Sequence, residues 1–307
     1  MRYSFIIPVY NRPEEVDELL NSLTRQTNKN FEVLIVEDGS SVPCKEVVDN
    51  YADRLDICYY FKSNSGPGQT RNYGAERGHG EYLIILDSDC ILPEGYLAAV
   101  ESELQQQKAD AFGGPDCAHD SFTNIQKAIN YAMTSFFTTG GIRGGKKKMD
   151  KFYPRSFNMG VRAEVYKALG GFSKMRFGED IDFSIRIFQG GYACRLFPEA
   201  WVWHKRRTDL KKFFKQVHNS GIARINLYKK YPESLKVVHL LPALFTIGIV
   251  FLLLCSLVCS WSLSLLLLFA LIICVDSTLR NKSFKIGLLS ILASFIQLIG
   301  YGTGFLR

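Results

Sequence analysis

Two aspartates separated by one serine follow a run of apolar and aromatic residues. Residues 82–86 predict a buried strand, and Asp87-Ser88-Asp89 comes directly after it. Two carboxylates one residue apart at a strand end can hold a hard divalent cation and leave open positions for phosphate oxygens. A D-x-D triplet also arises by chance in many loops, so two solvated acids explain the triplet as well when it is taken alone.

Two further polar segments follow predicted strands. Asp38 comes after residues 31–37, where its carboxylate can accept a hydrogen bond from a base N–H or simply form an Asp-Gly-Ser turn. Residues 64–74 are glycine-rich and open a helix, so their backbone amides and Arg71 could face a nucleotide. A capped helix N-terminus explains this second segment equally well in isolation.

Gly178-Glu179-Asp180 precedes a predicted helix over residues 181–189. The helix macrodipole favours ionised carboxylates at this position, whether for stability alone or to keep one of them ready to accept a proton. The apolar stripe of the helix is expected to consist of Ile181, Ile185 and Phe188. Asp182 and Arg186 are expected to pair on the exposed side, which leaves either Glu179 or Asp180 free to face a pocket. His204 ends an apolar run and is more often a packed residue than a ligand.

The elements that must position these residues alternate along the first hundred residues. Strands are predicted over 4–8, 31–37, 57–61 and 82–86, and helices over 13–26, 43–52 and 67–77. Alternation with short connections predicts an α/β fold with right-handed crossovers and a mostly parallel sheet. Ligands of such sheets bind outside the carboxyl ends of the strands. The polar residues expected there are Asn11, Asp38, Asn64 and the D-x-D triplet.

The order and spacing of five motifs resemble those of family 2 glycosyltransferases. The motifs are Pro8-Val9-Tyr10-Asn11-Arg12-Pro13, Val36-Glu37-Asp38-Gly39-Ser40, Arg71-Asn72-Tyr73-Gly74, Leu86-Asp87-Ser88-Asp89 and Gly170-Gly171-Phe172 followed by Gly178-Glu179-Asp180. The resemblance covers about residues 4–204 and implies the GT-A fold, a Rossmann-like, mostly parallel sheet with flanking helices. It also implies an inverting transfer of sugar from a nucleotide diphosphate to an acceptor hydroxyl.

The same resemblance assigns expected roles to individual residues. The implied nucleotide site consists of Pro8, Tyr10, Asn11, Arg12, Asp38, Arg71, Asp87 and Ser88, with Asp38 facing the base. The implied Mg²⁺ or Mn²⁺ ion would be held by Asp89, with Asp87 and His204 as further contacts. Asp180 is implied as the catalytic base, and Glu179 competes for that role. UDP is the expected nucleotide, because an acid facing an N–H suits uracil, although thymine or guanine would serve as well.

Two departures from the family pattern and two alternatives bear on this expectation. Glu37 stands where the family usually has Asp, with little expected consequence. No Gln-x-x-Arg-Trp motif follows Asp180, so processive chain extension is not expected.

A transferase that loads sugar onto polyprenyl phosphate is the closest alternative, although an ionised phosphate acceptor needs no base. A membrane scaffold that binds nucleotide sugar without catalysis is the second alternative.

The apolar residues are concentrated after residue 236. Residues 1–236 are therefore expected to form the GT-A catalytic domain and residues 237–307 a transmembrane helical region. A span needs about 20 apolar residues. The runs 240–259, 261–275 and 286–305 predict three spans, with two as the fallback, and a three-span chain would leave Arg307 outside.

Charge and targeting patterns predict where the chain resides. Residues 204–236 carry ten Lys or Arg against two acids just before the first apolar run. This pattern fits the positive-inside rule and anionic lipid headgroups better than nucleic acid. Residues 1–12 hold no secretory signal pattern. The chain is therefore expected to be a multi-pass cell-membrane protein with a cytoplasmic catalytic domain, acting on a glycan or lipid-linked acceptor.

Three segments complete the expectations. Leu210, Phe213, Phe214 and Val217 recur at helical spacing between lysines and predict a juxtamembrane amphipathic helix suited to a membrane surface. Residues 138–151 hold four glycines and several cations and are expected to form a lid over the donor or an anionic acceptor. The eight cysteines show no C-x-x-C spacing and are expected to be reduced thiols.

Overall fold

The computed structural model describes residues 3–117, 122–139 and 152–307. The chain divides into two compact units. The first consists of Met1–Cys117 and Lys148–His204, and the second of Ala118–Lys147 and Lys205–Arg307. Residues 205–236, which hydropathy placed with the catalytic domain, thus cluster with the apolar helices.

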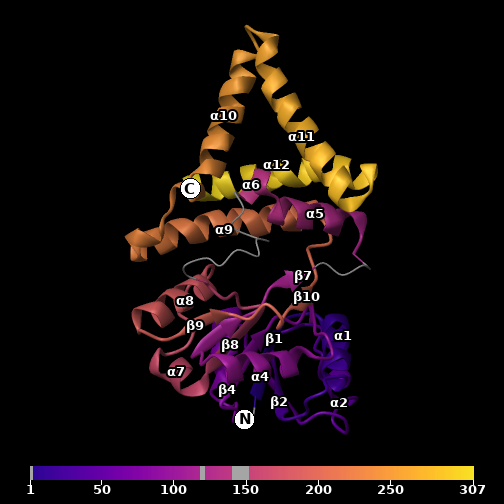
Figure 1. Ribbon diagram of the computed structural model, residues 1–307, viewed down its shortest axis with the longest axis vertical. Helices are drawn as coiled ribbons and strands as arrows, with labels where there is room; N and C mark the ends of the chain where they lie inside the picture. The colour runs from indigo at the N-terminus through magenta and orange to yellow at the C-terminus, as the bar shows by residue number, and fades with distance from the viewer. Residues whose placement is uncertain (1–2, 118–121, 140–151) are drawn as a thin grey trace. The chain divides into compact units, whose positions relative to one another are not determined.

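The first unit is built on a seven-stranded sheet in the order β3-β2-β1-β4-β8-β6-β9 (Figure 1). Its strands are β1 (Tyr3–Val9), β2 (Phe31–Asp38), β3 (Ile57–Lys62), β4 (Tyr82–Leu86), β6 (Ala111–Gly113), β8 (Asn158–Arg162) and β9 (Cys194–Leu196). Strands β1 to β4 are parallel, whereas β8 runs antiparallel to both β4 and β6. The predicted mostly parallel α/β sheet is confirmed.

Helices cover both faces of this sheet, which explains why its strands read as continuous apolar runs. The helices are α1 (Pro13–Thr24), α2 (Lys45–Asp49), α3 (Pro67–Ala75), α4 (Tyr96–Gln106), α7 (Ala163–Ala168) and α8 (Glu179–Gln189). Phe5 of β1 packs in a core with α1 and α4, and the next residue, Ile6, packs in a second core with α7 and α8. Successive side chains of a strand point to opposite faces, so both cores start from one strand.

The buried face of α8 differs from the predicted one. Of the predicted stripe, Ile185 is buried, whereas Ile181 and Phe188 are only half-buried. Phe183 and Ile187 are fully buried in the second core instead. The predicted pair of Asp182 and Arg186 forms with a 3.0 Å separation, but Asp182 is completely buried. The expected exposed side was therefore wrong, because the charged pair lies within the packing of this helix.

A second, three-stranded sheet joins distant parts of the first unit. It consists of β5 (Cys90–Ile91), β10 (Val202–His204) and β7 (Asp116–Cys117), in the order β5-β10-β7. In the antiparallel register of β5 and β10, His204 lies opposite Cys90. This pairing brings the end of the unit to the D-x-D triplet.

The second unit is helical. It contains α5 (Asn124–Thr134), α6 (Phe136–Thr139), α9 (Leu210–Lys230), α10 (Leu241–Cys255), α11 (Ser264–Asn281) and α12 (Phe284–Leu306), with 3₁₀ turns at Pro232–Ser234, Val237–His239 and Ser260–Leu263. Trp261–Asn281 and Phe284–Leu306 are long and apolar enough to cross a membrane, whereas α10 has 15 residues. The proposed lid falls almost wholly on residues 140–151, outside the described residues.

Candidate active site

The carboxylate of Asp38 lies at the end of β2 and is buried. It accepts hydrogen bonds from Lys62 Nζ at 2.7 Å, Ser65 N at 2.9 Å and Gly66 N at 3.0 Å. Burial alone would raise the pKa of Asp38, but these hydrogen bonds and the charge of Lys62 outweigh it and lower the pKa. Asp38 is therefore held ionised and fixes the loop that opens α3.

The loop after β1 is tied to the loop after β2. Asn11 has a positive φ of 54°, and its Oδ1 accepts a hydrogen bond from Val42 N at 2.9 Å. Its own N–H donates to Ser40 Oγ at 2.8 Å. Tyr10 is 54% exposed, so its ring is open to a ligand, and Pro8, two residues earlier, is half-buried.

The guanidinium of Arg71, carried by α3, links two of the acidic motifs. Its Nη2 donates to Asp87 Oδ1 at 2.8 Å, and its Nη1 donates to Glu179 Oε1 at 3.0 Å. Arg71 is only 4% exposed, and the two carboxylates raise its pKa against the opposing effect of burial. Burial in turn raises the pKa of Glu179, against the effect of Arg71. The D-x-D triplet and the Gly-Glu-Asp motif therefore meet at one buried cation.

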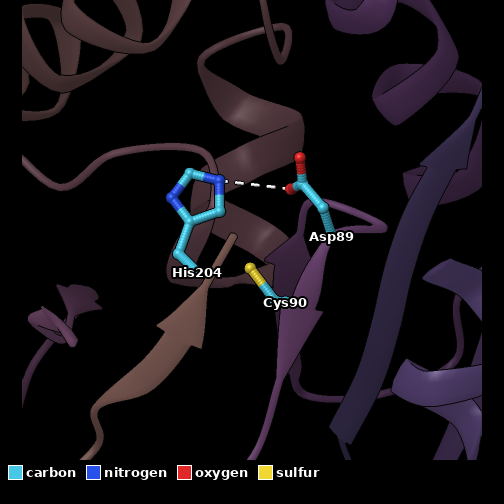
Figure 2. A group of neighbouring side chains, drawn as sticks. All are labelled: Asp89, Cys90 and His204. Carbon is cyan, nitrogen blue, oxygen red and sulfur yellow. Dashed lines mark ion pairs between the residues drawn. The ribbon is translucent and has the colours of Figure 1, made fainter. Parts of the chain in front are cut away.

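A potential metal site lies beside this cluster. The ligand atoms of Asp89, Cys90 and His204 lie within 4.8 Å of one another, and His204 Nε2 is 3.1 Å from Asp89 Oδ1 (Figure 2). A carboxylate oxygen and an imidazole nitrogen suit Mn²⁺, and the carboxylate suits Mg²⁺. Burial raises the pKa of the Cys90 thiol well above its usual value. A soft sulfur ligand also suits Mg²⁺ and Mn²⁺ less well than oxygen does. The donor set therefore fits a hard or borderline divalent ion held by Asp89 and His204.

Further contacts complete the site. Arg12 forms an ion pair with Asp89, and the ring of His204 stacks on Phe157 at 4.7 Å. Asp180 Oδ2 lies 3.1 Å from Arg155 Nε, while Asp180 Oδ1 accepts from Ile181 N at 2.8 Å. Asp180 and Glu179 thus meet different cations at the start of α8.

The described residues bring most of the predicted site together in the first unit. Ser88 is buried between the two aspartates, and Asp87 contacts Arg71 rather than the group around Asp89. Sequence reasoning missed Lys62, Arg155 and Cys90. The parallel register that pairs Asp38 with Lys62 could have revealed Lys62, because both residues end adjacent strands. Arg155 carries no local signal.

Comparison with solved structures supports the fold. The crystal structure of S. aureus TarS 1–349 in complex with UDP-GlcNAc has a TM-score of 0.53 at 19% identity, covering 74% of this chain and 67% of that chain. Mannosyltransferase PcManGT from Pyrobaculum calidifontis, in complex with GDP-Man and Mn²⁺, has a TM-score of 0.67 at 18% identity, covering 95% of this chain and 86% of that chain. The second likeness includes the helical unit and confirms the predicted architecture.

Sequence comparison identifies the family. Glycosyltransferase AglE of Haloferax volcanii is 27% identical over 259 residues, covering 76% of this chain and 79% of that protein. The chain spans only about a fifth of the length of the Rickettsia felis and Rickettsia conorii glycosyltransferases that it matches, 22% and 20%. The model of glycosyl transferase family 2 matches residues 4–170, more than half of the chain. The resemblance inferred from the motifs is confirmed, and the chain belongs to glycosyl transferase family 2.

Proposed function

We propose that this chain transfers a sugar from a nucleotide-diphosphate donor to an acceptor hydroxyl, with inversion at the anomeric carbon. The observation that carries the proposal is the contact of Arg71 with both Asp87 and Glu179, which joins the two acidic motifs in one cluster. The cluster lies at the carboxyl end of β4, where ligands of parallel sheets bind. The two solved structures compared above hold UDP-GlcNAc or GDP-Man, which supports a nucleotide-sugar donor.

The proposed nucleoside site lies around Asp38 and Tyr10. A carboxylate offers about four lone-pair sites. Oδ1 of Asp38 accepts from Lys62 Nζ and Ser65 N, and Oδ2 accepts from Gly66 N. We propose that a base N–H is bound at Oδ2, beside the Thr70 side chain, which also interacts with this carboxylate. The exposed ring of Tyr10 can stack on the base. We propose UDP as the nucleotide, because uracil presents a single N–H for this position.

The proposed metal ligands are Asp89 and His204. A bound Mg²⁺ or Mn²⁺ would act as a Lewis acid toward the leaving diphosphate. Asp89 now pairs with Arg12 as well as with His204. Arg12 is therefore free to turn toward the diphosphate when a divalent ion takes over the charge of Asp89.

The proposed base is Asp180. Glu179 forms its ion pair with the buried Arg71. Asp180 forms its ion pair with Arg155, whose side chain is 36% exposed. An exposed guanidinium can move into solvent at small cost, which would leave the Asp180 carboxylate available for the acceptor hydroxyl. Asp180 would take the acceptor proton as the new glycosidic bond forms.

We further propose that the second unit anchors the enzyme to the cell membrane and that the first unit works in the cytoplasm on a glycan or lipid-linked acceptor. The apolar helices α10 and α11, the second of which is long enough to cross a membrane, support an anchor. The ten cations of residues 204–236 support the cytoplasmic orientation through the positive-inside rule.

A thermal-shift panel of UDP-, dTDP- and GDP-sugars with Mn²⁺ tests the donor. The true donor at a hundred times its Kd should stabilise the protein by about 2.7 kcal/mol. Asp89→Ala should abolish the metal-dependent part of that shift, and Asp53→Ala, at an exposed acid of the same unit, should retain it. Unchanged donor affinity of Asp89→Ala with Mn²⁺ in calorimetry would refute the metal assignment.

A further inference from the structure

Helix α12 closes the open end of the pair formed by α10 and α11 (Figure 1). A methyl group added at Gly287, near the start of α12, would lie 2.0 Å from Thr278 Oγ1 of α11. One added at Gly302, near its end, would lie 2.1 Å from Thr246 Oγ1 of α10. Between these points Phe295 packs against Phe245 and Phe269. Helix α12 therefore runs from the base of one helix to the base of the other, about 22 Å away.

Helix α12 also packs closely along the amphipathic α9. A methyl group at Gly304 would lie 2.0 Å from the carbonyl oxygen of His218, and one at Gly221 would lie 2.2 Å from that of Tyr301. The ring of His218 lies 3.1 Å from Thr303 Oγ1. The apolar side of α9, with Phe213 and Val217 buried, is thus covered by α12 and α5.

The remaining surface of α9 is cationic. Its exposed lysines are Lys211, Lys212, Lys215, Lys229 and Lys230. Cations at the centre of a bilayer are costly, whereas the headgroup region of an anionic membrane attracts them. A helix that carries these lysines stays at the membrane surface, and α12 is fixed alongside it.

The pair α10–α11 has the opposite character. No charged residue occurs between residues 240 and 275. Leu257, Val258 and Trp261, where the two helices meet, are 83%, 95% and 79% exposed. An exposed apolar surface of this extent in a helical pair fits the hydrocarbon of a bilayer.

From this layering we infer that α10–α11 is the part of the described second unit that enters the bilayer, and that α12 lies in the plane of an anionic membrane surface. Helix α12 joins the bases of α10 and α11. It therefore lies on the side of the membrane from which the α10–α11 hairpin enters. Arg307 is then on the same side of the membrane as α9. The three-span expectation puts Arg307 on the other side.

A two-tag cleavage assay separates these arrangements. The full chain carries one protease-cleavable tag before residue 1 and another, on a long linker, after Arg307. It is reconstituted in random orientation into vesicles of phosphatidylglycerol and phosphatidylethanolamine, washed with carbonate at high pH and treated with the protease. With both ends on one side, each molecule loses both tags or neither, and intact-mass analysis should show these two species alone.

A matched control carries an added transmembrane helix between Arg307 and the second tag, and it should yield singly cleaved molecules. Singly cleaved molecules from the unmodified chain would overturn the inference, because α12 would then cross the membrane. Release of the chain by the carbonate wash would overturn it as well, since no hairpin would be inserted. Sugar transfer is not measured, so failure of the proposed catalytic activity leaves this result unaffected, and only the proposed membrane anchor is tested together with it.

Discussion

The two units maintain close packing by different chemical means. The first surrounds its site with charged groups that neutralise one another at short range, as Arg71 does with Asp87 and Glu179. In the second unit, helices approach closely where a glycine has no side chain, as at Gly221 and Gly304 between α9 and α12. Glycine at a helix contact lets two backbones approach closely, because no side chain stands between them.

The two units are therefore expected to tolerate different substitutions. Removal of one charge from the first unit leaves a buried partner without compensation. Addition of one methyl group to the second unit forces two backbones apart. Four measurements probe this contrast, beginning with the reaction that the paired charges would serve.

Asp180→Asn should lower kcat by about 10²–10⁴ while donor and metal binding persist, because the general base is lost. Glu179→Gln should mainly raise the acceptor KM. Arg155→Gln is the matched control, since it removes the same ion pair but keeps the carboxylate, and it should turn over almost normally. Steady-state kinetics with a UDP-sugar donor measure all three.

Two outcomes would reassign these roles. An inactive Glu179→Gln together with a near-normal Asp180→Asn would make Glu179 the base. Near-normal turnover in both variants would point to an acceptor that needs no base, and polyprenyl phosphate would become the leading candidate.

Arg71→Met should destabilise the first unit by about 3–5 kcal/mol, because Glu179 and Asp87 lose the buried cation between them. Arg54→Met removes an exposed ion pair with Asp53 and should cost at most about 1 kcal/mol. Denaturant unfolding in detergent provides the comparison. The double variant Arg71→Met, Glu179→Gln should recover part of the loss, and strict additivity of the two changes would contradict the coupling.

Gly304→Ala should destabilise the second unit by about 1–3 kcal/mol, since its methyl group meets the backbone of α9. Gly248→Ala, in the middle of α10, meets no atom within 4 Å and should be neutral or slightly stabilising. Thermal unfolding in detergent, followed by the helical signal, distinguishes the two. Equal melting temperatures would show that the α9–α12 contact does not determine stability.

Acidification should weaken the first unit through Glu32. Burial raises the pKa of Glu32, but hydrogen bonds from Ser4 Oγ and from the backbone and ring of His79 outweigh it and lower the pKa. A lowered pKa means that the stabilisation is present at neutral pH and is lost as the pH falls below about 4. Glu32→Gln should flatten the pH dependence of the unfolding midpoint between about pH 5 and 3, and an unchanged slope would exclude Glu32 as its source.

The parts of the fold that the sequence predicted are those whose patterns are local. The first four strands were predicted to within one residue at each end. Strands β1, β2 and β4 are buried on both faces and therefore read as apolar runs, and β3, which is only partly buried, is marked by its run of aromatic and apolar residues. Strands β5 and β7 have two residues each and form only because His204 lies opposite Cys90 and Val202 opposite Asp116. No residue near Cys90 predicts that pairing.

The candidate site divides in the same way. The order of the motifs predicted the acidic residues of the site. The cations that pair with these acids come from elsewhere in the chain, as Arg155 does for Asp180. An apolar stripe on a helix also does not indicate whether a membrane or another helix covers it. The stripe of α9 was expected to face a membrane, and in the second unit Phe213 and Val217 are buried against other helices.

The charges around Arg71 also bear on the order in which ligands arrive. Four carboxylates are faced by three guanidinium groups, so the unliganded cluster carries a single excess negative charge when His204 is neutral. A divalent ion alone would reverse that sign, and a doubly charged nucleotide sugar alone would deepen it. The divalent ion and the donor together leave the net charge of the cluster unchanged. Binding of the anionic donor before the cation is thus disfavoured, so the cation should enter before the donor or together with it.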